Sequence, residues 1–176
     1  RIGETLGGRI IQAPAGLPAR PTTDYAKSGL FNVLNNEIDF ESIEVLDLFS
    51  GLGGISFEFI SRGASKVTAV DANFKCIQFL KDTAVKLKVN NLDTVRSDVF
   101  KYLNRCEQQF DLIFADPPFD MKETDDLIPL ILEKKLLRPD GLLIVEHQSS
   151  RELQFPEKIR SLRTYGNCSF SFIKPE

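Results

Sequence analysis

The sequence predicts an α/β fold built on a mostly parallel sheet, and three observations support this. Short apolar segments alternate with longer segments whose apolar residues recur at helical spacing. Several apolar segments end in an acidic residue that is followed by a loop. Near the C-terminus the alternation stops, and two apolar segments flank Gly166-Asn167, which is typical of an antiparallel hairpin. Alternating strands and helices form a parallel sheet that is covered on both faces.

Each element can be placed from its own pattern. Parallel strands are expected at residues 43–49, 66–70, 93–96, 110–115 and 141–146, and helices between them at about 54–62, 73–88, 97–105 and 123–136. Residues 162–165 and 169–173 complete a seven-stranded sheet as the antiparallel hairpin. An earlier helix, ending near Asn36, is expected to follow the N-cap candidates Thr22, Thr23 and Asp24.

The chain is interpreted as one domain over residues 1–176, with its core at 23–176. Residues 1–22 are rich in Gly, Pro and Arg and predict a small N-terminal β-hairpin extension with Gly7-Gly8 at its turn. The net charge is −3, but residues 1–30 and 150–176 each carry +2, so phosphate contacts are expected from the two ends.

Composition excludes several classes of protein. With 42% hydrophobic and 27% charged residues, the 176-residue chain has the composition of a folded globular protein. No apolar segment reaches membrane-spanning length and no signal peptide is evident, so we expect a cytoplasmic protein without membrane contact. The three scattered cysteines are expected to be reduced, and with a single histidine they form no metal-ligand spacing. We therefore expect no metal.

The first half of the alternating region predicts a nucleoside cofactor site. Gly51 and Gly53 form a loop at the carboxyl end of the first strand, where ligands bind in open α/β sheets. Asp71 ends the second strand and suits a ribose diol, while Asp98 follows the third strand and is placed to bind an adenine amino group or to cap a helix. Asp47 disfavours a pyrophosphate and favours a cationic sulfonium cofactor.

The Asp-Pro-Pro-Phe segment at the end of the fourth strand predicts a site for an exocyclic amine. The Asp116 carboxylate can accept one N–H and a carbonyl of the rigid Pro117-Pro118 turn can accept the other. Phe119 offers a face on which a planar base can stack. Asp and Pro are also common turn residues, so the segment alone is equally compatible with an ordinary turn.

Taken together, these segments resemble the class I S-adenosylmethionine-dependent methyltransferases, whose fold is Rossmann-like. The Asp-Pro-Pro-Phe segment resembles the signature of enzymes that methylate planar amine nitrogens. Arg20-Pro21-Thr22-Thr23-Asp24, followed by Leu30-Phe31-Asn32, resembles the motif of the RsmD family, bacterial enzymes that methylate a guanine N2 of 16S ribosomal RNA. This resemblance extends over nearly the whole chain. The chain departs from the family after Asp24, where Tyr25-Ala26 stands in place of the usual Arg and Glu.

The resemblance implies S-adenosyl-L-methionine as cofactor, S-adenosyl-L-homocysteine as product, and 16S rRNA in an assembled or assembling small subunit as partner of a monomeric enzyme. The implied catalytic residues are Asp116, Pro117, Pro118 and Phe119. The implied cofactor-binding residues are Asp47, Phe49, Gly51, Gly53, Asp71, Ala72, Asp98, Val99, Asp116, Thr22 and Thr23. The implied RNA-binding residues are Arg9, Arg20, Asp24 and Phe119.

Other functions remain open at this point. A DNA amino-methyltransferase or a protein-glutamine methyltransferase would use the same chemistry, although the first usually needs an added recognition region and the second usually carries Asn at position 116. A cofactor-binding, RNA-associated module without catalysis is a third possibility. A nicotinamide dehydrogenase is disfavoured because Ser56 replaces the third glycine of the dinucleotide fingerprint.

Overall fold

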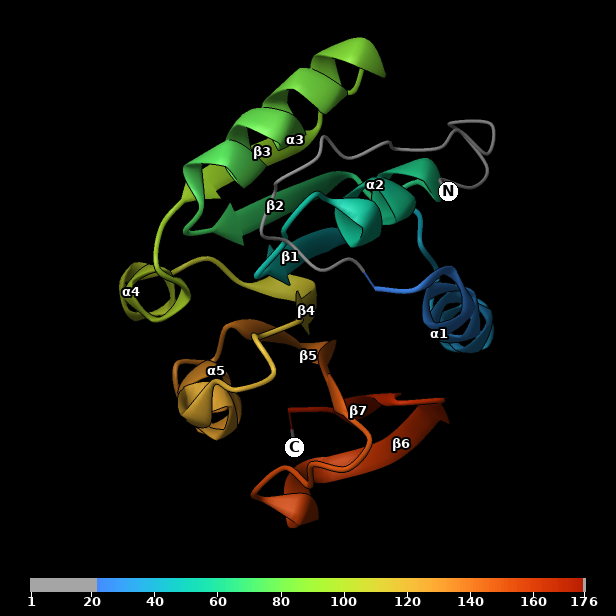
Figure 1. Ribbon diagram of the computed structural model, residues 1–176, viewed down its shortest axis with the longest axis vertical. Coiled ribbons are helices and arrows are strands. Elements are labelled where there is room, and N and C mark those ends of the chain that lie inside the picture. The colour runs from blue at the N-terminus through green and yellow to red at the C-terminus, as the bar shows by residue number, and fades with distance from the viewer. Residues whose placement is uncertain (1–21, 176) are drawn as a thin grey trace.

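The computed structural model describes residues 22–175. Seven strands of this part form a sheet in the order β3-β2-β1-β4-β5-β7-β6 (Figure 1). They are β1 (Glu44–Leu48), β2 (Lys66–Asp71), β3 (Leu92–Arg96), β4 (Phe110–Ala115), β5 (Leu137–Gln148), β6 (Ile159–Tyr165) and β7 (Cys168–Ile173). The first five are parallel, and β7 runs antiparallel between β5 and β6. The predicted sheet is confirmed, whereas the predicted hairpin extension lies, apart from Thr22, outside the described residues.

Helices cover both faces of this sheet. On one face α1 (Asp24–Glu37), α2 (Gly54–Ser61) and α3 (Phe74–Lys86) pack on a core that includes Leu112 and Phe114. On the other face α4 (Val99–Arg105) and α5 (Leu127–Glu133) pack on a core that includes Ile113 and Ala115. Successive side chains of a strand point to opposite faces, so β4 contributes to both cores and is apolar throughout.

The predicted helix at 123–136 is wrong in extent. Residues Lys122–Asp126 form a 3₁₀ turn, and the α-helix that follows ends at Glu133. Lys135 has a left-handed φ of 56°, and the next two residues, Leu136 and Leu137, are buried. The Phe110 N–H donates to the Leu136 carbonyl at 2.8 Å, so β5 begins four residues earlier than the predicted strand at 141–146.

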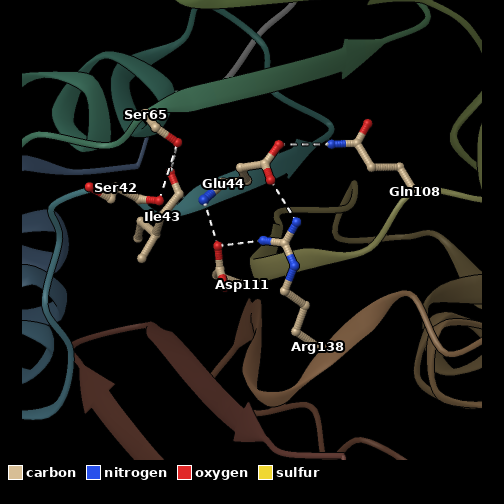
Figure 2. Close-up of polar contacts among 7 residues, drawn as sticks. All are labelled: Ser42, Ile43, Glu44, Ser65, Gln108, Asp111 and Arg138. Atoms are coloured by element: carbon tan, nitrogen blue, oxygen red, sulfur yellow. Dashed lines mark hydrogen bonds and ion pairs between the residues drawn. The ribbon is translucent and has the colours of Figure 1, made fainter.

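Ion pairs hold the amino ends of three strands together (Figure 2). Arg138 of β5 donates to Asp111 Oδ2 of β4 at 2.7 Å and to Glu44 Oε1 of β1 at 2.6 Å. The Glu44 N–H also donates to Asp111 Oδ2, at 2.8 Å. The polar side chains at the amino ends of these strands therefore pair with one another. The carboxyl ends of the strands, on the opposite side of the sheet, are left to form a site. Within the described residues no helix has the length and apolar character of a bilayer span.

Candidate active site

Acidic side chains gather at the carboxyl ends of four neighbouring strands. Asp71 ends β2, Asp47 lies one residue before the end of β1, and Asp116 follows β4 directly. Glu146 lies near the end of β5, where Ala115 pairs with Val145 and thus places Asp116 level with it. The strands are parallel, so these carboxyl groups share one edge, the edge at which open α/β sheets bind ligands.

The loop between β1 and α2 is held in an unusual backbone conformation. Phe49, Gly51 and Gly53 have positive φ angles of 59°, 54° and 89°. A Cβ on Gly53 would lie 2.3 Å from Leu80 Cδ2, so only glycine fits there. A left-handed backbone is unfavourable for Phe49, so interactions elsewhere in the fold must stabilise it. Such strained residues are common in functional loops.

Asp71 supports this loop through its carboxylate. Its Oδ2 accepts the Gly51 N–H at 2.9 Å and its Oδ1 accepts the Asn73 N–H at 2.9 Å. Each carboxylate oxygen has a further lone pair, so Asp71 can still accept hydrogen bonds from a ribose diol. Beside it, the buried Ser50 hydroxyl has no hydrogen-bond partner among the described residues. The exposed Ala72 follows Asp71 between β2 and α3.

Asp47 lies beneath the loop and is only 1% exposed. It accepts a hydrogen bond from Ser56 Oγ at 2.6 Å. Burial, reinforced by the nearby negative charges of Asp71 and Glu146, raises the pKa of Asp47 to about 7, and the Ser56 bond opposes this rise. Asp47 is therefore a buried carboxyl beneath the glycine loop, and a cationic ligand nearby would favour its ionised form.

The Asp-Pro-Pro-Phe segment forms a turn in which one proline carbonyl accepts a hydrogen bond and the other accepts none from the described residues. The Asp116 N–H donates to the Leu48 carbonyl at 3.2 Å, which fixes the turn against β1. The Pro118 carbonyl accepts the Met121 N–H at 3.0 Å, but no described residue donates to the Pro117 carbonyl. Phe119 is 36% exposed. Burial and the charges of Glu146 and Asp47 hold the pKa of Asp116 well above its usual range.

Glu146 is a site residue that the sequence analysis missed. Its Oε1 accepts a hydrogen bond from Thr22 Oγ1 at 2.7 Å, and its Oε2 accepts one from the Cys168 thiol at 3.3 Å. Burial raises the pKa of Glu146, against the effect of both hydrogen bonds. The available signal was the acid at the end of an apolar strand, the same pattern that singled out Asp47, Asp71 and Asp116.

The remaining predicted residues divide into three groups. Thr23 caps α1 by accepting the Ala26 N–H at 3.2 Å, and exposed Asp24 begins that helix. Asp98 caps α4 by accepting the Lys101 N–H at 3.0 Å, and Val99 after it is buried. Both caps lie at the same edge as the carboxylates, because α1 is joined to Glu146 through Thr22 and α4 follows β3. Arg9 and Arg20 lie outside the described residues.

Comparisons with known proteins agree with this arrangement. The family model described as "Conserved hypothetical protein 95" matches residues 2–174. YlbH of Bacillus subtilis (strain 168) is 36% identical, over 98% of this chain and 97% of its own length. The chain belongs to the RsmD family of S-adenosylmethionine-dependent methyltransferases.

Further relatives strengthen the RsmD assignment. Ribosomal RNA small subunit methyltransferase D of Haemophilus influenzae is 34% identical, over 78% of this chain and 72% of its own length. The solved structure of YhhF from Escherichia coli superimposes with a TM-score of 0.87 at 28% identity, covering 100% of this chain and 97% of that one. The class I methyltransferase fold and the family predicted from the sequence are thus confirmed.

Proposed function

We propose that this protein transfers a methyl group from S-adenosylmethionine to the exocyclic N2 of a guanine in small-subunit 16S ribosomal RNA. The observation that carries the proposal is the turn after β4, where the Asp116 carboxyl and the unpaired Pro117 carbonyl lie beside partly exposed Phe119. Relatives named ribosomal RNA small subunit methyltransferase D, at 34% and 33% identity, support the choice of RNA.

The residues at the sheet edge fit a cationic nucleoside cofactor. Asp71 retains acceptor capacity beside the glycine loop, and the unpaired Ser50 hydroxyl lies in the same loop. Asp47, Asp116 and Glu146 provide negative charge with no basic partner among the residues described. A bound cation would favour their ionised forms and relieve their mutual repulsion. We assign Phe49, Gly51, Gly53, Asp71, Ala72, Asp98 and Val99 to this cofactor half, with Asp47 acting from below.

When bound, S-adenosylmethionine supplies an electrophilic methyl group on a sulfonium. The amine of guanine is a weak nucleophile because its lone pair is delocalised into the ring. Asp116 and the Pro117 carbonyl, each accepting one N–H, would localise that lone pair and aim it at the methyl group. Phe119 would hold the unstacked base, and the Pro117-Pro118 turn would fix the distance between the two acceptors. The proton released from nitrogen can pass to Asp116 or to water.

The decisive experiment measures methyl transfer to small ribosomal subunits from a strain that lacks this protein, followed by mapping of the modified base. Asp116→Asn keeps the size of the side chain but replaces one acceptor oxygen with a donor, so transfer should fall by about 10²–10³. Binding of S-adenosylhomocysteine, measured by calorimetry, should be nearly unchanged.

Asp140→Asn is the matched control, because Asp140 is exposed and lies in the amino-terminal part of β5, away from the site. It should transfer methyl groups at the wild-type rate. Full activity of Asp116→Asn would contradict the assigned role. Labelling confined to DNA or to a protein glutamine would instead select one of the other amine substrates, and cofactor binding without any transfer would indicate a non-catalytic module.

A further inference from the structure

A groove lies between α1 and β6. It has a volume of about 380 Å³ and is lined by Gly29, Asn32, Val33, Asn36, Glu37, Arg163 and Tyr165. This volume falls at the lower end of the range of ligand pockets, roughly 300–1,000 Å³. We propose that the groove binds a nucleotide of single-stranded RNA next to the methylated guanine, an inference that rests on the proposed function.

Glycine at position 29 makes room for the aromatic ring at the groove. A Cβ on Gly29 would lie 2.1 Å from Tyr165 Cε1, so the ring occupies the space that a side chain would fill. Tyr165 also contacts Phe170, with ring centroids 6.0 Å apart, so packing holds the ring in place. Packing against Gly29 of α1 and against Phe170 therefore holds the Tyr165 ring in one position on the wall of the groove.

A second aromatic ring lies beside the groove, in contact with Tyr165. Tyr25 is 68% exposed and meets Tyr165 edge to face, with ring centroids 5.6 Å apart. An exposed tyrosine of this kind is a platform for base stacking, which tolerates any base because every base has a π face. The T-shaped contact leaves most of the Tyr25 surface open to a ligand.

The Tyr25–Tyr165 pair lies at the same end of the sheet as Asp116. Tyr165 ends β6 and pairs with Cys168 of β7, whose thiol donates to Glu146. Two strand spacings, roughly 10 Å, therefore separate the Tyr165 end of β6 from β5. Thr22, which donates to Glu146, is three residues before Tyr25. A strand of RNA whose guanine enters the site would thus pass close to the Tyr25–Tyr165 pair.

Charges in the groove favour a phosphate at one end. Arg163 is two residues before Tyr165 and so faces the same side of β6, and its guanidinium pairs with no carboxylate among residues 22–175. Glu37 lines the opposite end, 12 residues beyond Tyr25 or about 18 Å along the helix axis. Asn32 and Asn36 also line the groove. The Asn36 amide nitrogen donates to the Asn32 carbonyl at 3.4 Å, which leaves the Asn36 amide oxygen and the Asn32 side-chain amide to pair with a base edge.

The test uses fluorescence anisotropy with a labelled single-stranded RNA of about a dozen nucleotides that contains one guanine. Tyr25→Ala should weaken binding roughly tenfold, and Tyr25→Phe, which keeps the stacking ring, should bind like wild type. Arg163→Ala should weaken binding and reduce the slope of log K against log salt by about 0.7, the effect of one lost phosphate contact on a single strand.

Two control variants separate the groove from general effects. Arg105→Ala removes the same charge from an exposed position on α4, on the other face of the sheet. Leu162→Ala trims an exposed side chain from the opposite side of β6. Both should bind RNA like wild type, and all variants should bind S-adenosylhomocysteine equally. These results together would support the groove as an RNA site.

Other outcomes would overturn the inference. The inference would be wrong if Tyr25→Ala and Arg163→Ala bound RNA with wild-type affinity. It would also be wrong if Arg105→Ala lost as much RNA affinity as Arg163→Ala. Lost methyl transfer to ribosomal subunits with unchanged oligonucleotide binding would assign the groove to a protein partner instead. Failure of the proposed function is distinguishable, because it would appear as groove-dependent RNA binding by a wild-type protein that transfers no methyl group to ribosomal RNA.

Discussion

Buried carboxyl groups dominate the site at the level of single residues. Asp47, Asp116 and Glu146 all have raised pKa values, and burial is the main cause for each. A carboxyl with a raised pKa in the folded state favours folding while it is protonated. Its contribution is present in full below the ordinary pKa and is lost as the pH rises to the folded-state value. Ionising these carboxyl groups as the pH rises to their folded-state pKa values therefore lowers the stability of the fold.

Asp47→Asn tests this cost directly. The pKa of Asp47 is raised from 3.8 to about 7, so wild-type stability should decline as the pH rises between these values. The free energy of unfolding of Asp47→Asn relative to wild type should therefore improve by about 2–3 kcal/mol between roughly pH 5 and pH 8. Urea denaturation at the two pH values measures this difference. Asp140→Asn should show none, and equal pH dependence in all three proteins would contradict the raised pKa.

Glu146→Gln tests a positioning role. Glutamine keeps an oxygen for Thr22 Oγ1 but removes a negative charge that helps to raise the pKa of Asp116. If Asp116 must be ionised to accept the amine, the rising limb of the rate–pH profile should move to lower pH in this variant. A limb that stays in place while the overall rate falls would indicate a purely structural Glu146.

At the level of elements, most strands and helices were predictable because their patterns are local. Thr23 and Asp98 cap the helices that their sequence positions suggested. The helix predicted at 123–136 failed in extent because Leu136 and Leu137 continue its apolar spacing but are buried instead just before and at the start of β5. Pairing with Phe110 decided their conformation, and such long-range pairing overrides local propensity.

The contact between α1 and β6 gives a prediction at this scale. Gly29→Ala gains helix propensity but forces Tyr165 away from its packing on Tyr25 and Phe170, so it should lower stability by about 1–3 kcal/mol. Gly54→Ala is the matched helical control, because its Cβ would meet no atom within 4 Å, and it should lose nothing. Urea denaturation compares the two, and equal stability would count against the close packing.

At the level of the whole molecule, the sheet explains why the site was only partly predictable. Asp47, Asp71 and Asp116 follow apolar segments, and parallel strands bring such positions to one edge. The pairing of Thr22 with Glu146 joins residues 124 positions apart and leaves no local signal. The depth of Asp47 was also not evident, because it depends on α2 folding over the strand and placing Ser56 against the carboxyl group.

A cofactor that binds the folded protein raises the unfolding temperature of the whole domain, so the shift in Tm shows which cofactor binds. A ligand that binds only the folded state at about 100 times its Kd adds about 2.7 kcal/mol. For a chain of this size, S-adenosylmethionine should then raise Tm by roughly 5–10 °C. NADH at the same concentration should leave Tm unchanged. A shift with NADH alone would revive the dehydrogenase interpretation.

The row of carboxylates along the sheet edge also bears on the order of events during turnover. RNA is a polyanion, and Asp71, Asp47, Asp116 and Glu146 would repel it to the extent that they are ionised without a cation beside them. On the proposed function, these carboxyl groups would repel RNA less with a cationic cofactor beside them than with the neutral product S-adenosyl-L-homocysteine. Loss of one positive charge on methyl transfer would thus weaken the attraction between this site and the methylated strand.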